Sequence, residues 1–233
     1  MNPTTDLKRF CRSNGADLVG VADLGPFKSN IPVVPHDLLD IYTHAVSVAI
    51  HLEDAVLDDI TDHPTQEYAE HYRSTNASLD RLTGEVLQWI TARGFHAHPV
   101  PASFIADEKN LLGHVSHKAV ARMAGIGWQG KSLLIISPEF GPRIRLATVL
   151  TDMPLKADKP LPQKCGTCAE CARACPSSAI KNVAAKDGYA GRDEALHFLR
   201  CVEKTLEFSR LPGIGARICG VCVKVCPFGR KAP

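Results

Sequence analysis

The stretch Cys165-Gly166-Thr167-Cys168-Ala169-Glu170-Cys171-Ala172-Arg173-Ala174-Cys175-Pro176 decides how the last third of this chain folds. It has the form C-x2-C-x2-C-x3-C-P, and a related C-x2-C-x3-C-P stretch follows at residues 219–227. In bacterial ferredoxins the three closely spaced cysteines of such a run hold one 4Fe-4S cluster, and the cysteine before the proline ligates the other cluster. We therefore expect this region to bind two 4Fe-4S clusters.

The eight cysteines of this region are enough for two clusters. The second stretch lacks a first cysteine, because position 216 is alanine, and Cys201 is the nearby candidate that can replace it. Residues 202–218 then form an insert in an otherwise symmetric motif. We expect one cluster on Cys165, Cys168, Cys171 and Cys226, and the other on Cys175, Cys201, Cys219 and Cys222.

Disulfides and zinc are the alternative uses of these cysteines. Disulfides need an oxidising compartment, whereas the residues after Met1 lack the basic stretch and apolar run of a signal peptide. Zinc sites pair C-x2-C knuckles and require neither a further cysteine three residues on nor the proline. The ninth cysteine, Cys11, has helical spacing with Leu7 and is expected to be a small core residue.

Length and charge divide the chain into two expected domains, residues 1–155 and residues 156–233. Residues 152–164 contain three prolines and no periodic apolar pattern, which is typical of a linker. Residues 1–155 carry 13 Lys/Arg and 18 Asp/Glu, a net charge of −5, and residues 156–233 carry 14 and 7, a net charge of +7. The basic excess is expected to compensate the negative clusters, and a nucleic-acid surface is the alternative interpretation.

The first domain has an alternating pattern of helices and strands. Strands are predicted at residues 17–24, 45–52, 96–103, 132–137 and 143–151, and a long helix or helix pair at residues 65–93. No apolar run approaches about 18 residues, so no membrane-spanning segment is expected. The fold class is therefore α+β, and the protein is expected to work in a reducing cytoplasm.

The segment Gly125-Ile-Gly-Trp-Gln-Gly-Lys-Ser132 matches both the P-loop pattern G-x4-G-K-S and the pattern G-x-G-x-x-G. Both motifs require a strand before the glycines and a helix after them. Here residues 116–124 have a helical pattern and residues 132–137 a strand pattern, so ATP or dinucleotide binding is not expected. The glycines still indicate a tight turn and the close approach of a flat or bulky group.

Several of these motifs together resemble the epoxyqueuosine reductase family and the related reductive dehalogenases. They are Ser116-His117-Lys118, the glycine segment with Gly127, Trp128, Gly130 and Lys131, Thr151-Asp152-x-Pro154-Leu155, and the split cysteine motif. Residues 16–22 and 45–50 also match in position. The cysteine motif alone is common among iron-sulfur proteins, whereas its combination with the glycine segment is specific.

The resemblance implies a nitroreductase-like, cobalamin-binding α/β domain followed by a ferredoxin-like domain with two 4Fe-4S clusters, which supply single electrons to the cobalt. The residues it assigns to the cofactor are Ser116, His117, Lys118, Gly127, Trp128, Gly130 and Lys131. A flavin such as FMN is a less favoured occupant. An external donor such as ferredoxin or flavodoxin is implied as a partner, with a small molecule as the possible substrate and no membrane partner.

Two features depart from the family pattern. In these reductases an acidic residue lies about 14 positions before the first glycine, whereas this chain has Leu111 there and no carboxylate between residues 109 and 124. Asp107 and Glu108 are the nearest acids, and His114 is the candidate replacement as proton donor. Because the chain ends at Pro233, we expect a short form without the C-terminal helical-repeat extension, and tRNA is not expected as a partner.

Two functions from different classes remain open at this stage. In the first, the protein is an oxidoreductase whose clusters reduce a corrinoid or a substrate held by the first domain. In the second, it is a non-catalytic electron-transfer or corrinoid-reducing accessory protein. The complete α/β domain favours the first function, and the missing carboxylate favours the second.

Overall fold

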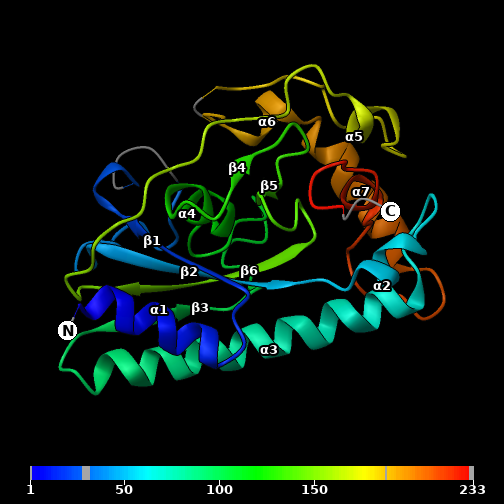
Figure 1. Cartoon of the computed structure of the whole chain (residues 1–233). Coiled ribbons are helices and arrows are strands. Elements are labelled where there is room, and N and C mark those ends of the chain that lie inside the picture. The colour runs from blue at the N-terminus through cyan, green and yellow to red at the C-terminus, as the bar shows by residue number, and fades with distance from the viewer. Residues whose placement is uncertain (1, 28–31, 187, 231–233) are drawn as a thin grey trace. The chain divides into compact units, whose positions relative to one another are not determined.

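The computed structural model describes residues 2–27, 32–186 and 188–230 (Figure 1). The helical elements are α1 (Pro3–Ser13), η1 (Gly25–Phe27), α2 (Asp54–Asp58), α3 (Gln66–Thr91), α4 (His117–Met123), α5 (Glu170–Arg173), α6 (Arg192–Ala195), α7 (Phe198–Ser209) and α8 (Val221–Lys224). The strands are β1 (Leu18–Asp23), β2 (His44–His51), β3 (Ala97–Val100), β4 (Trp128–Gln129), β5 (Ile135–Ile136) and β6 (Ile144–Thr151). This confirms a mixture of α and β structure.

The chain forms two compact units. Unit 1 comprises residues 1–50, 75–126 and 145–161, and unit 2 comprises residues 51–74, 127–144 and 162–233. The last passage of the chain from unit 1 to unit 2 lies within the proline-containing stretch 152–164. Segments 51–74 and 127–144 belong to the same unit as the cysteine motifs. A single boundary along the sequence therefore cannot separate the two units.

A four-stranded sheet in the order β1-β2-β6-β3 is the centre of unit 1. Strands β1 and β2 are antiparallel, with Val21 opposite Val46, and β3 and β6 are antiparallel, with Pro99 opposite Val149. These strands confirm four of the predicted ones. Most residues of β1, β2 and β6 are buried, because helices lie on both faces of the sheet, with α1 and α3 on one face and α4 on the other (Figure 1).

The apolar core of unit 1 lies between the sheet and the helices α1 and α3. The side chains of Leu79, Leu82, Val86 and Ile90 recur at helical spacing along α3 and are fully buried. Cys11 is buried in the same core, as predicted, and burial raises the pKa of its thiol to about 12. The long predicted helix is thus confirmed as one helix, which ends before Gly94 at φ 82°.

Two predicted strands are shorter than expected. Strand β3 contains only Ala97–Val100 of the predicted residues 96–103, and β5 contains only Ile135–Ile136 of the predicted residues 132–137. The chain turns just before it, where the amide of Leu133 donates to the carbonyl of Gly130 at 2.9 Å and Leu133 has φ 62°. An apolar sequence pattern does not reveal such a turn. The structure nevertheless keeps helix α4 before the glycine segment and a strand after it, which is the reverse of the P-loop order.

No helix within the described ranges is both long and apolar enough to cross a membrane.

Gly20 lies where β1 crosses the end of α4. A Cβ atom added to Gly20 would come within 2.0 Å of the carbonyl oxygen of Ala124 and 3.0 Å of its carbonyl carbon. The contact involves backbone on both sides, so neither partner can move away without shifting an element. Gly84 is a useful comparison, because it lies inside α3 and its added Cβ would meet nothing within 4 Å outside the helix backbone.

We predict that Gly20→Ala destabilises the protein by about 1–3 kcal/mol, because the methyl group overpacks this crossing. Gly84→Ala should instead stabilise it by about 0.5–1 kcal/mol, since alanine costs less backbone entropy in a helix. Urea unfolding followed by circular dichroism under anaerobic conditions measures both changes. Equal stability of Gly20→Ala and the parent chain would contradict the close crossing.

Candidate iron-sulfur centre

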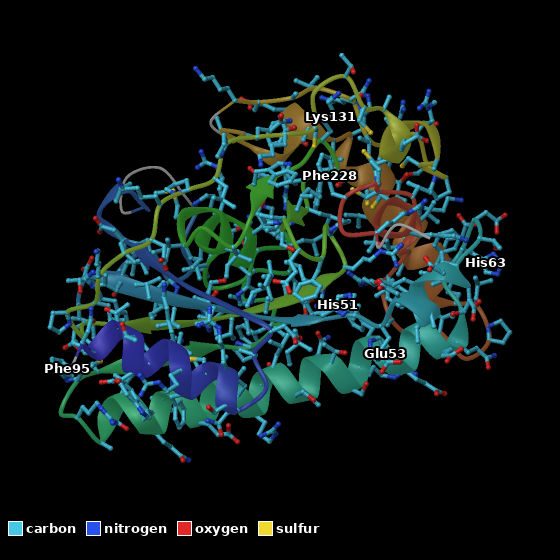
Figure 2. The ribbon with its side chains drawn as sticks, in the orientation of Figure 1. His51, Glu53, His63, Phe95, Lys131 and Phe228 are labelled. Atoms are coloured by element: carbon cyan, nitrogen blue, oxygen red, sulfur yellow. The ribbon has the colours of Figure 1, made fainter. Side chains whose placement is uncertain are left out.

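The eight cysteines of the C-terminal motifs all belong to unit 2, and none of them forms a disulfide among the described residues. Five of them line one pocket of this unit. The residues that line the pocket are Gly130, Lys131, Ser132, Ile136, Cys165, Cys168, Cys171, Cys222, Cys226, Pro227 and Phe228. Lys131 and Phe228 are labelled in Figure 2. The structure therefore brings cysteines from both motifs and residues of the glycine segment to one place.

The first motif winds as a loop around its own cysteines. The amide of Cys168 donates to the carbonyl of Cys165 at 3.0 Å, and Gly166 between them has φ 49°, a conformation that glycine adopts at little cost. The short helix α5 then carries Cys171. The amide of Ala179 donates to Cys175 Sγ at 3.3 Å, and although burial raises the pKa of Cys175, hydrogen bonds from Ser177 and Ala179 lower it below its usual value.

The second motif is held by an apolar cluster of unit 2. Leu57 of α2, Ile60 just after α2 and Tyr68 in the first turn of α3 pack in this cluster with Ile218 and Val221. Gly220 has φ 84°, and a Cβ added there would lie 2.4 Å from Cδ1 of Ile60. The loop that carries Cys219 and Cys222 therefore lies directly against α2 and α3. Helix α7 carries Cys201, and the expected insert is a helix followed by a returning turn.

Mutual electrostatic effects divide the eight thiols into two sets. Burial, and then the neighbouring thiols of Cys165, Cys171 and Cys168, raise the pKa of Cys226 to about 11. Burial, and then the thiols of Cys201 and Cys175, raise the pKa of Cys219 to about 11. The pKa of Cys222 is raised by burial and then by Cys219 and Cys201, with smaller effects of Cys171 and Cys175.

We call Cys165, Cys168, Cys171 and Cys226 the first cysteine set, and Cys175, Cys201, Cys219 and Cys222 the second cysteine set. These are the two ligand sets that the spacing of the motifs predicts, and the division of the cysteines between two clusters stays a prediction. Thiolate sulfur is the preferred donor for iron-sulfur clusters, and four thiolates is the usual number for a 4Fe-4S cluster. The residues present therefore fit two such clusters.

The glycine segment forms a short hairpin beside the first cysteine set. Strands β4 and β5 pair with Trp128 opposite Ile136. A Cβ added to Gly127 would lie 2.3 Å from the carbonyl oxygen of Ile136, and one added to Gly130 would lie 2.8 Å from Cγ1 of Ile136 and 3.5 Å from Cys165 Sγ. The bulky neighbours for which these glycines make room are thus the other strand of the hairpin and a cysteine loop.

Two side chains of this segment are deeply buried. Lys131 is 5% exposed, and its Nζ donates to the carbonyl oxygen of Cys168 at 2.8 Å and to Oδ1 of Asn182 at 3.0 Å. Trp128 is 2% exposed, packs edge-on against Phe228 with ring centroids 5.0 Å apart, and has an indole N–H without a hydrogen-bond partner among the described residues. Sequence reasoning did not find Asn182, because nothing in the local pattern links it to Lys131.

The other predicted cofactor residues, Ser116, His117 and Lys118, lie at the start of α4 in unit 1. Ser116 caps the helix by accepting a hydrogen bond from the amide of Ala119 at 3.3 Å. His117 Nε2 lies 3.0 Å from the carbonyl oxygen of Pro101, and Nδ1 lies 2.8 Å from the hydroxyl of Thr148. Since a carbonyl only accepts, Nε2 carries the proton and Nδ1 accepts from Thr148. Lys118 follows on the same helix.

The candidate proton donor His114 lies in the loop that precedes α4. Its Nδ1 donates to the carbonyl oxygen of Val34 at 2.6 Å, and its ring lies 4.7 Å from that of Phe104 and 5.5 Å from that of His98. Asp107, the nearest acid in the sequence, accepts hydrogen bonds from the side chain and the amide of Asn110, which lower the pKa of its carboxyl. Asp107 is therefore ionised near neutral pH.

Comparison with known proteins assigns a class to unit 2. A family model described as "4Fe-4S double cluster binding domain" matches residues 164–229. The chain therefore contains a domain of the class that binds two 4Fe-4S clusters.

Known proteins that resemble this chain in sequence include epoxyqueuosine reductases and a reductive dehalogenase. Epoxyqueuosine reductase of Bacillus cereus is 37% identical over 117 residues, which cover 49% of this chain and 30% of that protein. Tetrachloroethene reductive dehalogenase of Sulfurospirillum multivorans is 40% identical over 148 residues, covering 60% of this chain and 27% of that protein. The predicted similarity to epoxyqueuosine reductases and reductive dehalogenases is thus confirmed. In these matches the chain spans less than a third of each relative's length.

A solved structure extends the similarity to the whole fold. A reductive dehalogenase for which a mechanism of B12-dependent dehalogenation was suggested matches 97% of this chain and 31% of its own, with a TM-score of 0.71 and 21% identity. At this identity the match demonstrates a shared fold.

We predict that His117 stays neutral, with its proton on Nε2, as the pH falls from 7.5 to 5.5. Burial in unit 1 lowers its pKa to about 4, so protonation costs stability only as the pH falls below 6.5 and towards 4. Nitrogen-15 NMR of the histidine rings reports both the tautomer and the titration. A titration of His117 with a midpoint near 6.5 would contradict a buried ring whose two nitrogens are both hydrogen-bonded.

Proposed function

We propose that this chain is a redox protein that carries two 4Fe-4S clusters and passes single electrons to a corrinoid or to a small-molecule substrate held by its N-terminal, nitroreductase-like part. The observation that carries the proposal is the presence of eight cysteines outside disulfides in one unit, five of which line one pocket. The matched double cluster domain and the similarity to epoxyqueuosine reductases support it. We propose a reducing compartment, the cytoplasm, because free thiols persist there.

The first cysteine set would hold one cluster and the second cysteine set the other. When bound, the clusters supply one-electron transfer without proton chemistry. The chain contributes the four thiolates of each set, the backbone turns that gather them, and the amide that donates to Cys175. Such hydrogen bonds to ligand sulfur are among the features that adjust a cluster's potential.

The ligand assignment predicts opposite results for two cysteines. Cys201→Ala should lower the iron content of the anaerobically reconstituted protein by about half and remove the electron paramagnetic resonance (EPR) signal of one cluster, because the second set loses a ligand. Cys11→Ala should change neither quantity, since Cys11 lies in the apolar core of unit 1. Full iron in Cys201→Ala, or loss of iron in Cys11→Ala, would refute the assignment.

An external protein such as a ferredoxin or a flavodoxin is the proposed electron donor. Unit 2 has an open groove whose lining contains one acidic residue, Glu170. The other residues that line it are Lys164, Cys165, Gly166, Thr167, Cys168, Val225, Pro227 and Arg230. This groove therefore exposes two ligands of the first cysteine set beside two cations. Residues 156–233 also carry a net charge of +7, which attracts an acidic donor protein.

The corrinoid part of the proposal rests on the B12-dependent relative. When bound, a corrinoid supplies a cobalt centre that accepts single electrons. Residue-level support comes from Trp128, whose buried N–H lacks a partner among the described residues. Gly127, Gly130, Lys131 and His117 already contact other protein groups, so their role toward a corrinoid is indirect. A flavin is the less favoured occupant.

His114 is the proposed proton donor to the substrate. It is half-buried, and its Nδ1–H donates to the carbonyl of Val34, so Nε2 of the imidazolium is the atom that would deliver the proton. Asp107 is a poor alternative because Asn110 stabilises its ionised form. The absence of a carboxylate between residues 109 and 124 is also why tRNA-bound epoxyqueuosine is not the proposed substrate.

The second candidate function is that of an electron-transfer or corrinoid-reducing accessory protein without substrate chemistry of its own. The missing carboxylate favours this function, because the cluster region is complete whereas the acid that the resemblance assigns to proton delivery is replaced by Leu111. Assays of corrinoid binding and of substrate reduction distinguish the two candidate functions, because only the first candidate reduces a substrate itself.

The first experiment adds cobalamin and a weak reductant to the anaerobically reconstituted protein and records EPR spectra. We expect a base-off cobalt(II) signal that appears when the protein is present and is absent from a sample of cobalamin and reductant alone. Trp128→Phe should weaken cobalamin binding about fivefold, the value of one net hydrogen bond. Cluster signals alone, without any effect of protein on the cobalt spectrum, would reject the corrinoid site and favour the accessory function.

A further inference from the structure

Lys131 is a buried cation whose charge the neighbouring protein groups do not balance. Lysine is almost never fully buried unless it is paired, and Lys131 is 5% exposed. Its two hydrogen-bond acceptors, the carbonyl of Cys168 and the side-chain amide oxygen of Asn182, are both neutral. Neutral acceptors satisfy N–H donors, but they do not supply the opposite charge that a buried ammonium requires.

A second buried cation of unit 2 shows what a paired site looks like. Arg143 is 1% exposed, and its guanidinium forms ion pairs with Asp54 at 3.1 Å and Asp58 at 2.9 Å. In the part of the chain that the structure describes, no carboxylate lies within ion-pair distance of Lys131. The countercharge of Lys131 is therefore to be sought in the pocket that it lines.

That pocket contains all four thiols of the first cysteine set. A 4Fe-4S cluster with four thiolate ligands carries a net negative charge, which resides close to the ligand loop. We propose that the ammonium group of Lys131 is the built-in countercharge of the first cluster and raises its reduction potential above that of the second cluster. The inference rests on the proposed function, because it requires that the first cysteine set binds a cluster.

The sign of the effect follows from electrostatics. Reduction adds one negative charge to the cluster, so a fixed positive charge nearby stabilises the reduced form more than the oxidised form and raises the potential. Burial strengthens the effect, because little water screens the ammonium. Electrons that enter the domain would then reside preferentially on the first cluster.

The second cysteine set has weaker compensation. Lys204 acts on Cys219, but its Nζ is paired with the carboxylate of Glu207 at 2.6 Å and its side chain is 26% exposed. A partly exposed lysine that is paired with a carboxylate contributes little net field, because the two charges largely cancel. The difference between the two clusters is therefore expected to come mainly from Lys131.

The backbone around Lys131 explains why it reaches this position. Gly130 has no side chain, so the backbone there lies close to Ile136 and to Cys165. Lys131 lies in the turn at residues 130–133 and lines the pocket. Gly130 and Lys131, which match the Gly-Lys pair of the P-loop pattern, thus place an ammonium group against the loop that contains Cys168. The same lysine also fixes that loop through the carbonyl of Cys168.

Redox titration followed by EPR tests this inference in a Cys201→Ala background, where the remaining signal belongs to the first cluster. Lys131→Met should lower the midpoint potential of that signal, and Lys131→Arg should keep it close to the parent value. Lys164→Met is the matched control, because Lys164 directly precedes Cys165 but is exposed. It should shift the potential much less, since water screens its charge.

Asn182→Asp keeps Lys131 and places a carboxylate on it, so it should lower the potential in the same direction by a smaller amount. This variant decides the question if Lys131→Met assembles no first cluster. An unchanged potential in Asn182→Asp and Lys131→Met, or an equal shift in Lys164→Met, would overturn the inference. Absence of iron from the parent chain would instead refute the proposed function.

Discussion

The close approach of eight thiol groups within one unit is the constraint on which the rest of the structure depends. Thiolates that lie close together repel one another, and burial raises the pKa of Cys219, Cys222 and Cys226 further above the usual value. Such an arrangement is stable only if other interactions hold the loops and if positive charge or metal lowers the repulsion. Segments from three parts of the chain meet this requirement.

Apolar packing and glycine conformations hold the two cysteine loops. The loop of the second motif rests on Ile60 and Tyr68 through Gly220, and the loop of the first motif rests on the hairpin that contains Gly130. The turn at Gly141 and the turn at Gly229 also meet backbone to backbone, because added Cβ atoms at these glycines would collide with Phe228 and Phe140. These contacts orient the thiols before any cofactor contributes, which lowers the cost of assembling a cluster site.

Much of the candidate site could be predicted from the sequence, because iron-sulfur motifs are local. The spacing of the first motif already implies a loop and a short helix, and the structure brings cysteines of both motifs to one pocket of unit 2. The strands and the long helix followed from apolar periodicity. The strand at residues 132–137 was predicted too long, because the turn at Leu133 depends on φ 62°, which an apolar side chain does not signal.

The sequence by itself determined the class of domain and the order of secondary structure, since both depend on residues close together in the chain. Only the tertiary structure decided that residues 51–74 and 127–144 join the cysteine motifs in one unit, and that Lys131 meets Cys168 and Asn182. It also decided that both ring nitrogens of His117 bond within unit 1. The physical reason is that a buried charge or a buried imidazole acquires its role from distant partners, and residue spacing does not encode which partners folding brings together.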